Sequence, residues 1–163
     1  MKYLATILLI ITCYLPAFSQ ALPCEGYDLL SDEMFYRGSG SGVDADSLIA
    51  RNKAMMIARQ RIITQVEANV KSTTEIYIQI IATDTDAQTI SYLQSLSLVV
   101  SKKLLVGSRV ACEQTKQRQD HKYESSVAVE VATSSIMTLL PTDDKYQIDW
   151  DKYTEILYAQ IHK

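Results

Sequence analysis

The sequence is short of the residues on which most metal and hydrolase chemistry depends. Two His and three Cys among 163 residues leave little material for a zinc site or a His-dependent triad. Only five Gly and three Pro are present, which excludes collagen-like and low-complexity chains. The formal net charge of −3 offers no basic surplus for binding a nucleic-acid backbone. With 47% hydrophobic and 21% charged residues, the chain is typical of one globular domain.

The start of the chain predicts a secretory signal peptide over residues 1–19. Lys2 precedes the apolar run Leu4–Ile11, and Ala17-Phe18-Ser19 places small residues at positions −3 and −1 of a cleavage site. The run is too short for a good membrane span, and an uncleaved N-terminal anchor is the alternative. Cleavage would leave one α+β envelope domain over 20–163, with 15 basic and 19 acidic residues.

Cysteine usage agrees with export. Cys13 lies inside the signal segment, so the mature chain keeps Cys24 and Cys112, an even pair that an oxidising compartment could join. The alternative is a buried Cys112 and an unpaired Cys24, because the sequence gives no distance between them. Lipidation of Cys13 or Cys24 is a further alternative, although Pro23 before Cys24 argues against lipoprotein processing.

The first half of the domain predicts a short strand, a flexible connection and a long helix. Met34–Arg37 is strand-like, and the glycine-rich run Gly38–Gly42 is interpreted as a loop. Asp44 or Asp46 then caps a helix from Ser47 to about Val70. Its apolar stripe steps by four and is rich in alanine, which allows close packing: Ala50, Ala54, Ala58, Ile62, Val66 and Val70.

The second half predicts the remaining strands and helices. Alternating Ile residues predict a half-buried strand over 75–82, and Asp84-Thr85-Asp86 would cap a segment over about 87–104 that favours helix, with strand as the alternative. Later segments predict two antiparallel strands (106–114 and 122–131) and a helix from about Trp150 capped by Asp149. The expected fold class is α+β, with a long amphipathic helix and further helices on a small, largely antiparallel sheet.

Candidate chemistry in the sequence has simpler explanations. Gly38–Gly42 resembles a phosphate loop only in its glycines, because Val43 replaces the third glycine of a dinucleotide fingerprint. His121 lies in a predicted hairpin loop and His162 at the chain end, so neither is a convincing base. The clustered aspartates lack the spacing of a calcium loop: Asp143, Asp144, Asp149 and Asp151. We predict no catalytic, cofactor-binding or metal-binding residues.

The run Ser39-Gly40-Ser41-Gly42, followed by the Ala-Arg-rich helix Ala50–Arg59, resembles a family of bacterial envelope proteins. This is the family of small, roughly twenty-kilodalton outer-membrane lipoproteins of LPP type, akin to the N-terminal domain of the flagellar protein FlgT. Leu105–Val110, Tyr123–Glu130 and Asp149–Tyr153 are similar to its closing hairpin and last helix. The resemblance implies a long helix on a small antiparallel sheet, an envelope location and no catalysis.

The expected function is therefore that of a non-enzymatic, exported envelope protein, an interaction or assembly module in the periplasm, at the outer membrane or secreted. Its partner would be another envelope protein or a second copy, paired through strand 122–131 if that strand lies at an edge. No nucleic acid or cofactor is expected, and membrane association is left open. The alternative is a periplasmic small-ligand binder with a pocket near Tyr36 or Tyr77.

Overall fold

The computed structural model describes residues 24, 26, 34–81, 86–141 and 146–162, so the predicted signal segment lies outside the described residues. The fold is α+β, as predicted, with a three-stranded antiparallel sheet and four α-helices in the described part. In chain order the elements are β1 (Phe35–Asp44), α2 (Ser47–Ile81), α3 (Ala87–Leu104), the 3₁₀ turn η3 (Leu105–Gly107), β2 (Arg109–Gln117), β3 (Tyr123–Ala132), α4 (Ser134–Met137) and α5 (Trp150–Ile161).

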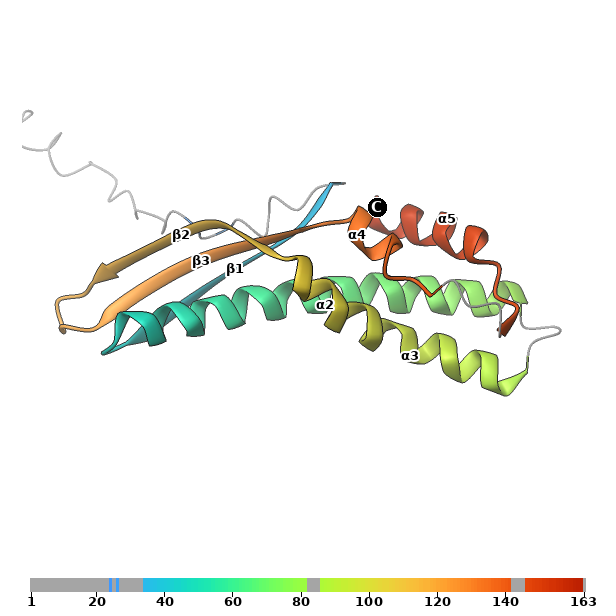
Figure 1. The fold of residues 1–163 in the computed structure, drawn as a ribbon, viewed down its shortest axis with the longest axis horizontal. Coiled ribbons are helices and arrows are strands. Elements are labelled where there is room, and N and C mark those ends of the chain that lie inside the picture. Colours follow the sequence, from blue (N-terminus) through green and yellow to red (C-terminus); the bar gives the residue numbers. More distant parts are fainter. Residues whose placement is uncertain (1–23, 25, 27–33, 82–85, 142–145, 163) are drawn as a thin grey trace, which may run out of the picture.

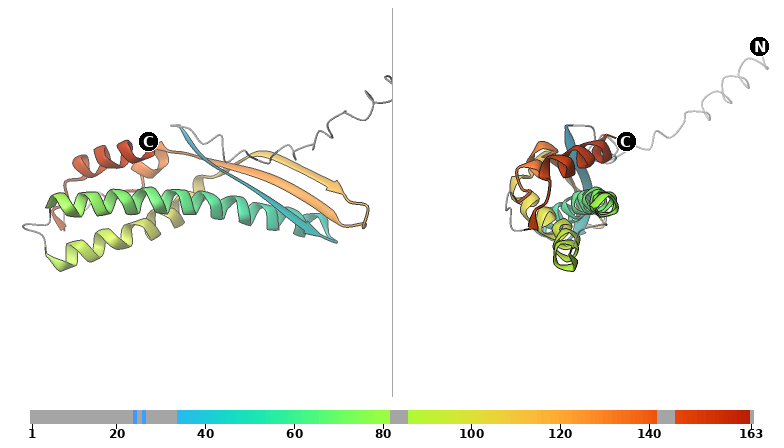
Figure 2. Two further views of the ribbon diagram at one scale, coloured as in Figure 1. Left: turned by 180° about the vertical axis from the view of Figure 1, so that it is seen from behind. Right: turned by 90° about the vertical axis from the view of Figure 1, so that its right-hand side faces the viewer.

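Helix α2 is the long axis of the molecule, and β1, β3, α3 and α5 pack along it. Its 35 residues run the length of the fold, with the sheet over the N-terminal half and α3 and α5 against the C-terminal half (Figures 1 and 2). We call these two parts the sheet half and the helical half. The core is continuous through both, because buried α2 residues from Ala54 to Tyr77 belong to one apolar cluster.

Glycine on β1 and alanine on α2 bring the helix backbone against the strand. A Cβ added at Gly38, Gly40 or Gly42 would lie 2.2–2.3 Å from the carbonyl oxygens of the facing alanines, Ala58, Ala54 and Ala50 respectively. The prediction of a flexible loop over Gly38–Gly42 is therefore wrong. These glycines are the helix-facing positions of a strand that continues to Asp44, and their role is steric.

The predicted strand over 75–82 is also wrong, and so is the expected end of the helix near Val70, because α2 continues to Ile81. The alternating isoleucines are not the residues that enter the core. Thr73, Thr74 and Tyr77 are buried, whereas Ile80 is exposed. Burial at these positions continues the helical period of Val66 and Val70. Packing against α5 thus overrides the modest β-propensity of the isoleucines.

The later helices agree with the sequence. The segment 87–104 is helical, and Asp86 begins α3 by accepting a hydrogen bond from Thr89 N at 2.8 Å. Asp149 caps α5 as predicted, with Lys152 N donating to its Oδ1 at 2.9 Å. Asp84 and Thr85, also predicted as capping residues, lie outside the described residues. At the start of α2, Asp46 is the cap, since Leu48 N and Ile49 N both donate to its Oδ1.

The strand order is β1-β3-β2, with both pairs antiparallel. The predicted hairpin is confirmed, but its first strand, predicted over 106–114, runs from Arg109 to Gln117. It starts later than predicted because Val106 and Gly107 belong to η3. β3 lies in the centre of the sheet. The predicted strand 122–131 is consequently not an edge, and the edges are β1 and β2.

Candidate interaction surface

The two edges of the sheet differ in what covers them. Along β1, side chains of α2 reach the strand's backbone: Gln65 Nε2 donates to Arg37 O at 3.1 Å, and Lys53 Nζ lies 3.4 Å from Val43 O. Along β2, the only strand paired in the described part is β3. Every β2 residue except the half-buried Cys112 is exposed. The β2 edge is therefore the open edge of this sheet among the described residues.

The ladder geometry identifies which β2 backbone groups face the open edge. At the hairpin end, Arg118 N donates to Lys122 O at 2.8 Å, so residue 118 points its backbone groups at β3. In an antiparallel pair, successive residues alternate between facing the partner strand and facing away. From the register, Glu113, Thr115 and Gln117 therefore direct their N–H and C=O groups outward.

Side-chain contacts fix β2 in place although it is exposed. Glu113 Oε1 accepts from Arg51 Nε of α2 at 2.6 Å, and this hydrogen bond lowers the pKa of the Glu113 carboxyl. Two residues further along β2, Thr115 Oγ1 donates to Ser125 Oγ of β3 at 2.9 Å. A register shift between Val110 and Cys112 marks a bulge at the other end. The strand is thus held by its charged and polar side chains rather than by burial.

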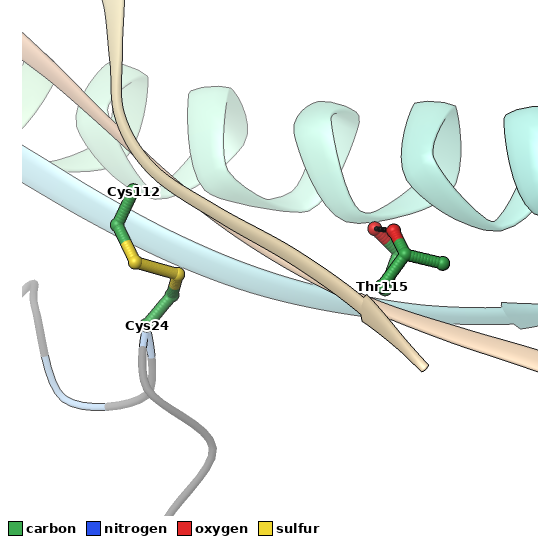
Figure 3. Close-up of a disulfide and its surroundings, with 4 residues drawn as sticks. Cys24, Cys112 and Thr115 are labelled. Atoms are coloured by element: carbon green, nitrogen blue, oxygen red, sulfur yellow. Dashed lines mark hydrogen bonds between the residues drawn. A yellow bond between two sulfur atoms is a disulfide. The ribbon is translucent and has the colours of Figure 1, made fainter. Parts of the chain in front are cut away.

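A disulfide attaches the start of the described chain to β2. Cys24 and Cys112 are bonded, with their Cα atoms 5.7 Å apart, and they are separated by 88 positions in the sequence (Figure 3). Cys24 is almost fully buried. The cysteine pairing that the sequence left open is therefore present, and it lies on the same strand as the open edge.

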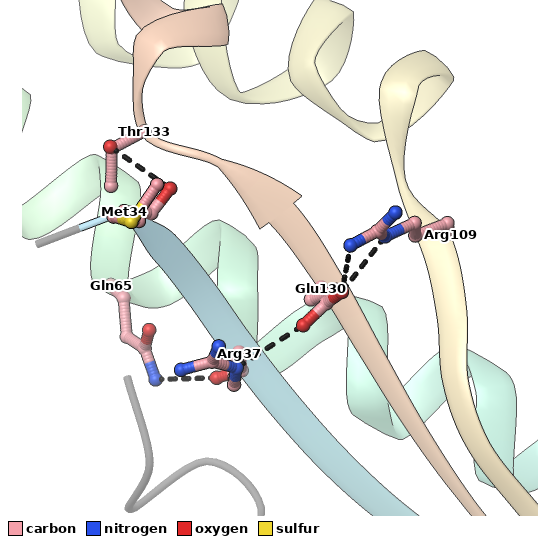
Figure 4. A network of polar contacts seen from close by, with 6 residues as sticks. All are labelled: Met34, Arg37, Gln65, Arg109, Glu130 and Thr133. Carbon is pink, nitrogen blue, oxygen red and sulfur yellow. Dashed lines mark hydrogen bonds and ion pairs between the residues drawn. The ribbon is translucent and has the colours of Figure 1, made fainter. Parts of the chain in front are cut away.

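The face of the sheet opposite α2 carries an ion ladder across all three strands. Glu130 of β3 is flanked by Arg37 of β1, with Nε at 3.2 Å, and by Arg109 of β2, with Nη2 at 2.6 Å (Figure 4). Both guanidinium groups also lie over the Phe35 ring, 5.3 and 5.4 Å from its centroid. Glu130 is buried, and its negative charge is balanced by the two arginines together. This ladder therefore fixes the register of the three strands.

This ladder is not predicted from the sequence, because its three members are far apart along the chain. The only available signal was the charge pattern of the strands, with Arg109 and Glu130 in two segments already predicted to pair. The polar run Glu113–Gln117 carried another signal, because a strand with no apolar residue on either side is typical of exposure on both faces.

The residues considered for catalysis lie apart. His121 is exposed in the β2–β3 turn, where it adopts a positive φ of 61°, and the ring of His162 lies tilted against that of Tyr158 at the end of α5. Asp149 is the α5 cap and Asp151 follows in its first turn, while Asp143 and Asp144 lie outside the described residues. In the part of the chain that is described, no three His, Cys, Asp or Glu residues are grouped to hold a metal ion.

Tyr36 and Tyr77, where a ligand pocket was expected, are structural. Tyr36 Oη accepts from Asn69 Nδ2 at 2.6 Å, and Tyr77 Oη accepts from Asp149 N at 2.8 Å. Burial raises the pKa of both phenols. Both side chains are buried in the core, so the expected pocket between α2 and the sheet is filled at these positions.

Surface hollows do occur elsewhere. One of about 300 Å³ lies between α2 and α3, lined by Lys71, Thr74, Glu75, Ile78, Gln94 and Ser97. Another, of about 420 Å³, lies on α2 beside β1 and is lined by Ile57, Gln60, Arg61, Thr64 and Gln65.

Comparison with protein-family models, with curated proteins and with solved structures gave no match. Among the described helices, none combines the length and apolar character that crossing a bilayer requires.

Proposed function

We propose that this protein is a non-enzymatic, exported protein of the cell envelope that serves as an interaction or assembly module through the open edge of β2. The observation that carries the proposal is the nine-residue exposed strand with outward backbone groups at Glu113, Thr115 and Gln117. A strand from another envelope protein or from a second copy would pair with these groups by strand addition. The disulfide supports export, since such bonds persist in oxidising compartments.

Thr115 provides the sharpest test of this edge. Proline at 115 removes an outward N–H without removing a β2–β3 ladder hydrogen bond, whereas Thr115→Val keeps the N–H and loses the same hydroxyl contact with Ser125. A photo-crosslinking side chain at Gln114 is expected to give an adduct of discrete mass in the envelope fraction. The adduct should disappear in Thr115→Pro and persist in Thr115→Val. Equal adducts in both variants, or none in the parent, would show that the β2 edge is not the contact surface.

An enzyme remains the rival class, and an activity screen separates it. Turnover of a substrate by the purified protein, abolished by Asp149→Asn or His121→Ala without unfolding, would contradict a non-enzymatic role. Because Asp149 caps α5, its variant needs a melting curve beside the assay. His121 is exposed, so its replacement is the cleaner arm.

A second candidate function is binding of a small envelope metabolite. The hollow between α2 and α3 favours it, because a volume of about 300 Å³ fits a small ligand and Lys71 and Glu75 offer opposite charges at its rim. A thermal-shift screen measures this directly. Stabilisation by a metabolite that Lys71→Met removes would support ligand binding, and no stabilisation by any metabolite would count against it.

A further inference from the structure

The charges along the open edge of β2 are neutralised by neighbours in the same chain. From Arg109 to Asp120, every charged residue takes part in an ion pair. The pairs are Arg109–Glu130, Arg51–Glu113, Lys116–Glu124 and Arg118–Asp120. Edge strands that stay unpaired are commonly protected by charged side chains, lysine above all. Because these charges are already balanced, the edge accepts a strand that carries no net charge of its own.

The part of the edge that can pair is short and lies towards the hairpin turn. A bulge between Val110 and Cys112 interrupts the ladder, and beyond it the outward backbone groups belong to Glu113, Thr115 and Gln117. Among the described residues, no loop, turn or helix forms a backbone hydrogen bond with these three. An antiparallel partner must therefore present three residues with the same spacing and orientation.

β2 itself is a strand of this kind. Two copies aligned antiparallel about Thr115 place Glu113 of each copy opposite Gln117 of the other, and Thr115 opposite Thr115, so the outward groups of both strands all pair. On the other face of the sheet, Lys116 of each copy lies opposite Gln114 of the other. No like charges face each other in this register, so the edge is complementary to itself.

Other registers of the same two strands are less favourable. Centring the pair on Glu113 opposes two glutamates, and centring it on Lys116 opposes two lysines. Centring it on Gln117 sets Lys116 opposite Arg118. Centring it on Gln114 avoids like charges, but Gln117 then lies opposite the bulge and fewer backbone groups pair. The alignment about Thr115 thus combines the most hydrogen bonds with compatible charges.

The helical layer leaves room for this pairing. Helix α2 packs on β1 and β3, and every β2 residue except the half-buried Cys112 is exposed. With strands about 4.8 Å apart, the α2 helices of two edge-paired copies would lie about 19 Å from each other on one face of the joined sheet. An α-helix with its side chains is about 10 Å across, so the two helices would not collide.

We infer that β2 pairs with β2 of a second copy of this chain, antiparallel and with a two-fold axis at Thr115. The two sheets then form one continuous sheet of order β1-β3-β2-β2-β3-β1. This inference rests on the proposed function, because it names the partner of the same open edge. The joined strands share about six hydrogen bonds, two for each pair of opposed outward residues. Such an interface is small, so the dimer is reversible, with a dissociation constant on the order of 10–100 µM.

Sedimentation equilibrium of the whole protein, purified as the cell processes it, measures this association. The mass should rise towards that of two chains between about 5 and 500 µM. Thr115→Pro removes one outward N–H in each copy, hence two of the interchain hydrogen bonds, and should raise the dissociation constant about thirtyfold. Thr115→Val keeps the N–H and should still dimerise. Melting curves check that both variants fold.

Exchanging charges at the axis gives a result that a folding defect cannot imitate. Thr115→Lys opposes two lysines and Thr115→Glu opposes two glutamates, so each variant alone should dimerise about tenfold more weakly than the parent at low salt. Mixed in equal amounts, the two variants should dimerise again, because lysine then faces glutamate. The matched control makes the same two substitutions at Gln79, an exposed residue in the helical half of α2. These control variants should dimerise like the parent.

Three results would overturn the inference. The first is a parent that stays monomeric at about 500 µM. The second is a parent-like dimer in Thr115→Lys and Thr115→Glu measured alone, or no gain when they are mixed. The third is an equal loss of dimer in the Gln79 variants.

Failure of this inference is distinguishable from failure of the proposed function. If the parent is monomeric but a crosslinker at Gln114 captures a different envelope protein, and Thr115→Pro abolishes that adduct, β2 strand addition stands and the second copy is the wrong partner. If the parent is monomeric and the crosslinker at Gln114 gives no adduct, both are wrong.

Discussion

The two halves of α2 solve the same packing problem with opposite side-chain sizes. In the sheet half, Ala50, Ala54 and Ala58 meet a strand whose facing residues have no side chain. In the helical half, Tyr77 and Tyr153 pack edge to face with ring centroids 5.5 Å apart, and Leu93 and Leu157 are fully buried. One helix can therefore form two kinds of interface. In the first, contact between the two backbones sets how closely helix and strand approach. In the second, large side chains fill the space between the helices.

The halves also differ in how they are kept in register. In the sheet half, charged pairs cross between elements, as at Arg51–Glu113 and in the Glu130 ladder. In the helical half, aromatic hydroxyls hold the elements together, with Tyr153 Oη 2.9 Å from Thr74 Oγ1. The two regions should accordingly respond to different perturbations, with effects of different size.

Enlarging a side chain in the sheet half should have the largest effect. The Cβ of Gly40→Ala would lie 2.3 Å from Ala54 O and 2.7 Å from Ala58 N. Both are helix backbone atoms, so the strand must move away, and we expect a loss of about 3 kcal/mol in the free energy of unfolding. Gly107→Ala is the control, since nothing lies within 4 Å of its new Cβ. Equal urea midpoints for the two variants would contradict the close-contact interpretation.

These same residues show where sequence reasoning succeeded and where it failed. The alanine stripe, the alternation of β3 and the Asp149 cap are local signals, and each predicted its element. Gly38–Gly42 was wrongly predicted to be a loop, because glycine-rich runs usually are loops. Only the close approach of the α2 backbone shows why these strand positions must be small. The pairing of Gly40 with Ala54 depends on two segments meeting, and a single period cannot reveal that contact.

The misreading over 75–82 has a related cause. Ile76, Ile78 and Ile80 alternate as in a strand, yet the buried residue of this stretch is Tyr77, whose hydroxyl binds Asp149 N seventy-two residues later. The open β2 edge likewise depends on strand order, which placed β3 in the centre. What the sequence could not predict are the features created by contacts between distant segments.

An intermediate effect is expected in the helical half at alkaline pH. Burial raises the pKa of Tyr153 to about 12, against an ordinary value of 10.0, although its hydrogen bond with Thr74 acts in the opposite direction. Above pH 10 the unfolded chain ionises first, so stability present at lower pH is lost as pH rises towards 12. At about pH 11 this group should account for a loss of about 1.4 kcal/mol.

Tyr153→Phe isolates this contribution. The variant should lose about 1 kcal/mol at neutral pH, since the hydroxyl no longer meets Thr74 Oγ1. Between neutral pH and about pH 11, however, its stability should fall less than that of the parent, by the amount assigned to the phenol. Urea unfolding at both pH values measures the difference. Parallel pH profiles for parent and variant would refute the assignment.

The smallest effect is expected from the Asp44–Lys53 pair at the other end of α2. The hydrogen bond from Lys53 Nζ, at 2.6 Å, is the main cause that lowers the pKa of Asp44 below its usual 3.8. A lowered carboxyl pKa gives stability that is present above that usual value and is lost as pH falls through the lower folded value. Both side chains are solvent-accessible, so screening keeps the contribution small.

A double-mutant cycle of Asp44→Asn and Lys53→Met measures the coupling free energy of this pair. Its dependence on acid pH can then be compared with the dependence of the Tyr153 contribution on alkaline pH. The coupling between the two positions should be detectable at neutral pH and should vanish in strong acid, where Asp44 is protonated and no longer carries a charge. Tyr153→Phe should leave that acid response unchanged, because it lies in the other half of α2. If Tyr153→Phe alters the acid response, or the Asp44–Lys53 coupling survives in strong acid, the two halves are not electrostatically independent. In that case it would be wrong that ion pairs hold the sheet half together while tyrosine hydroxyl groups independently hold the helical half.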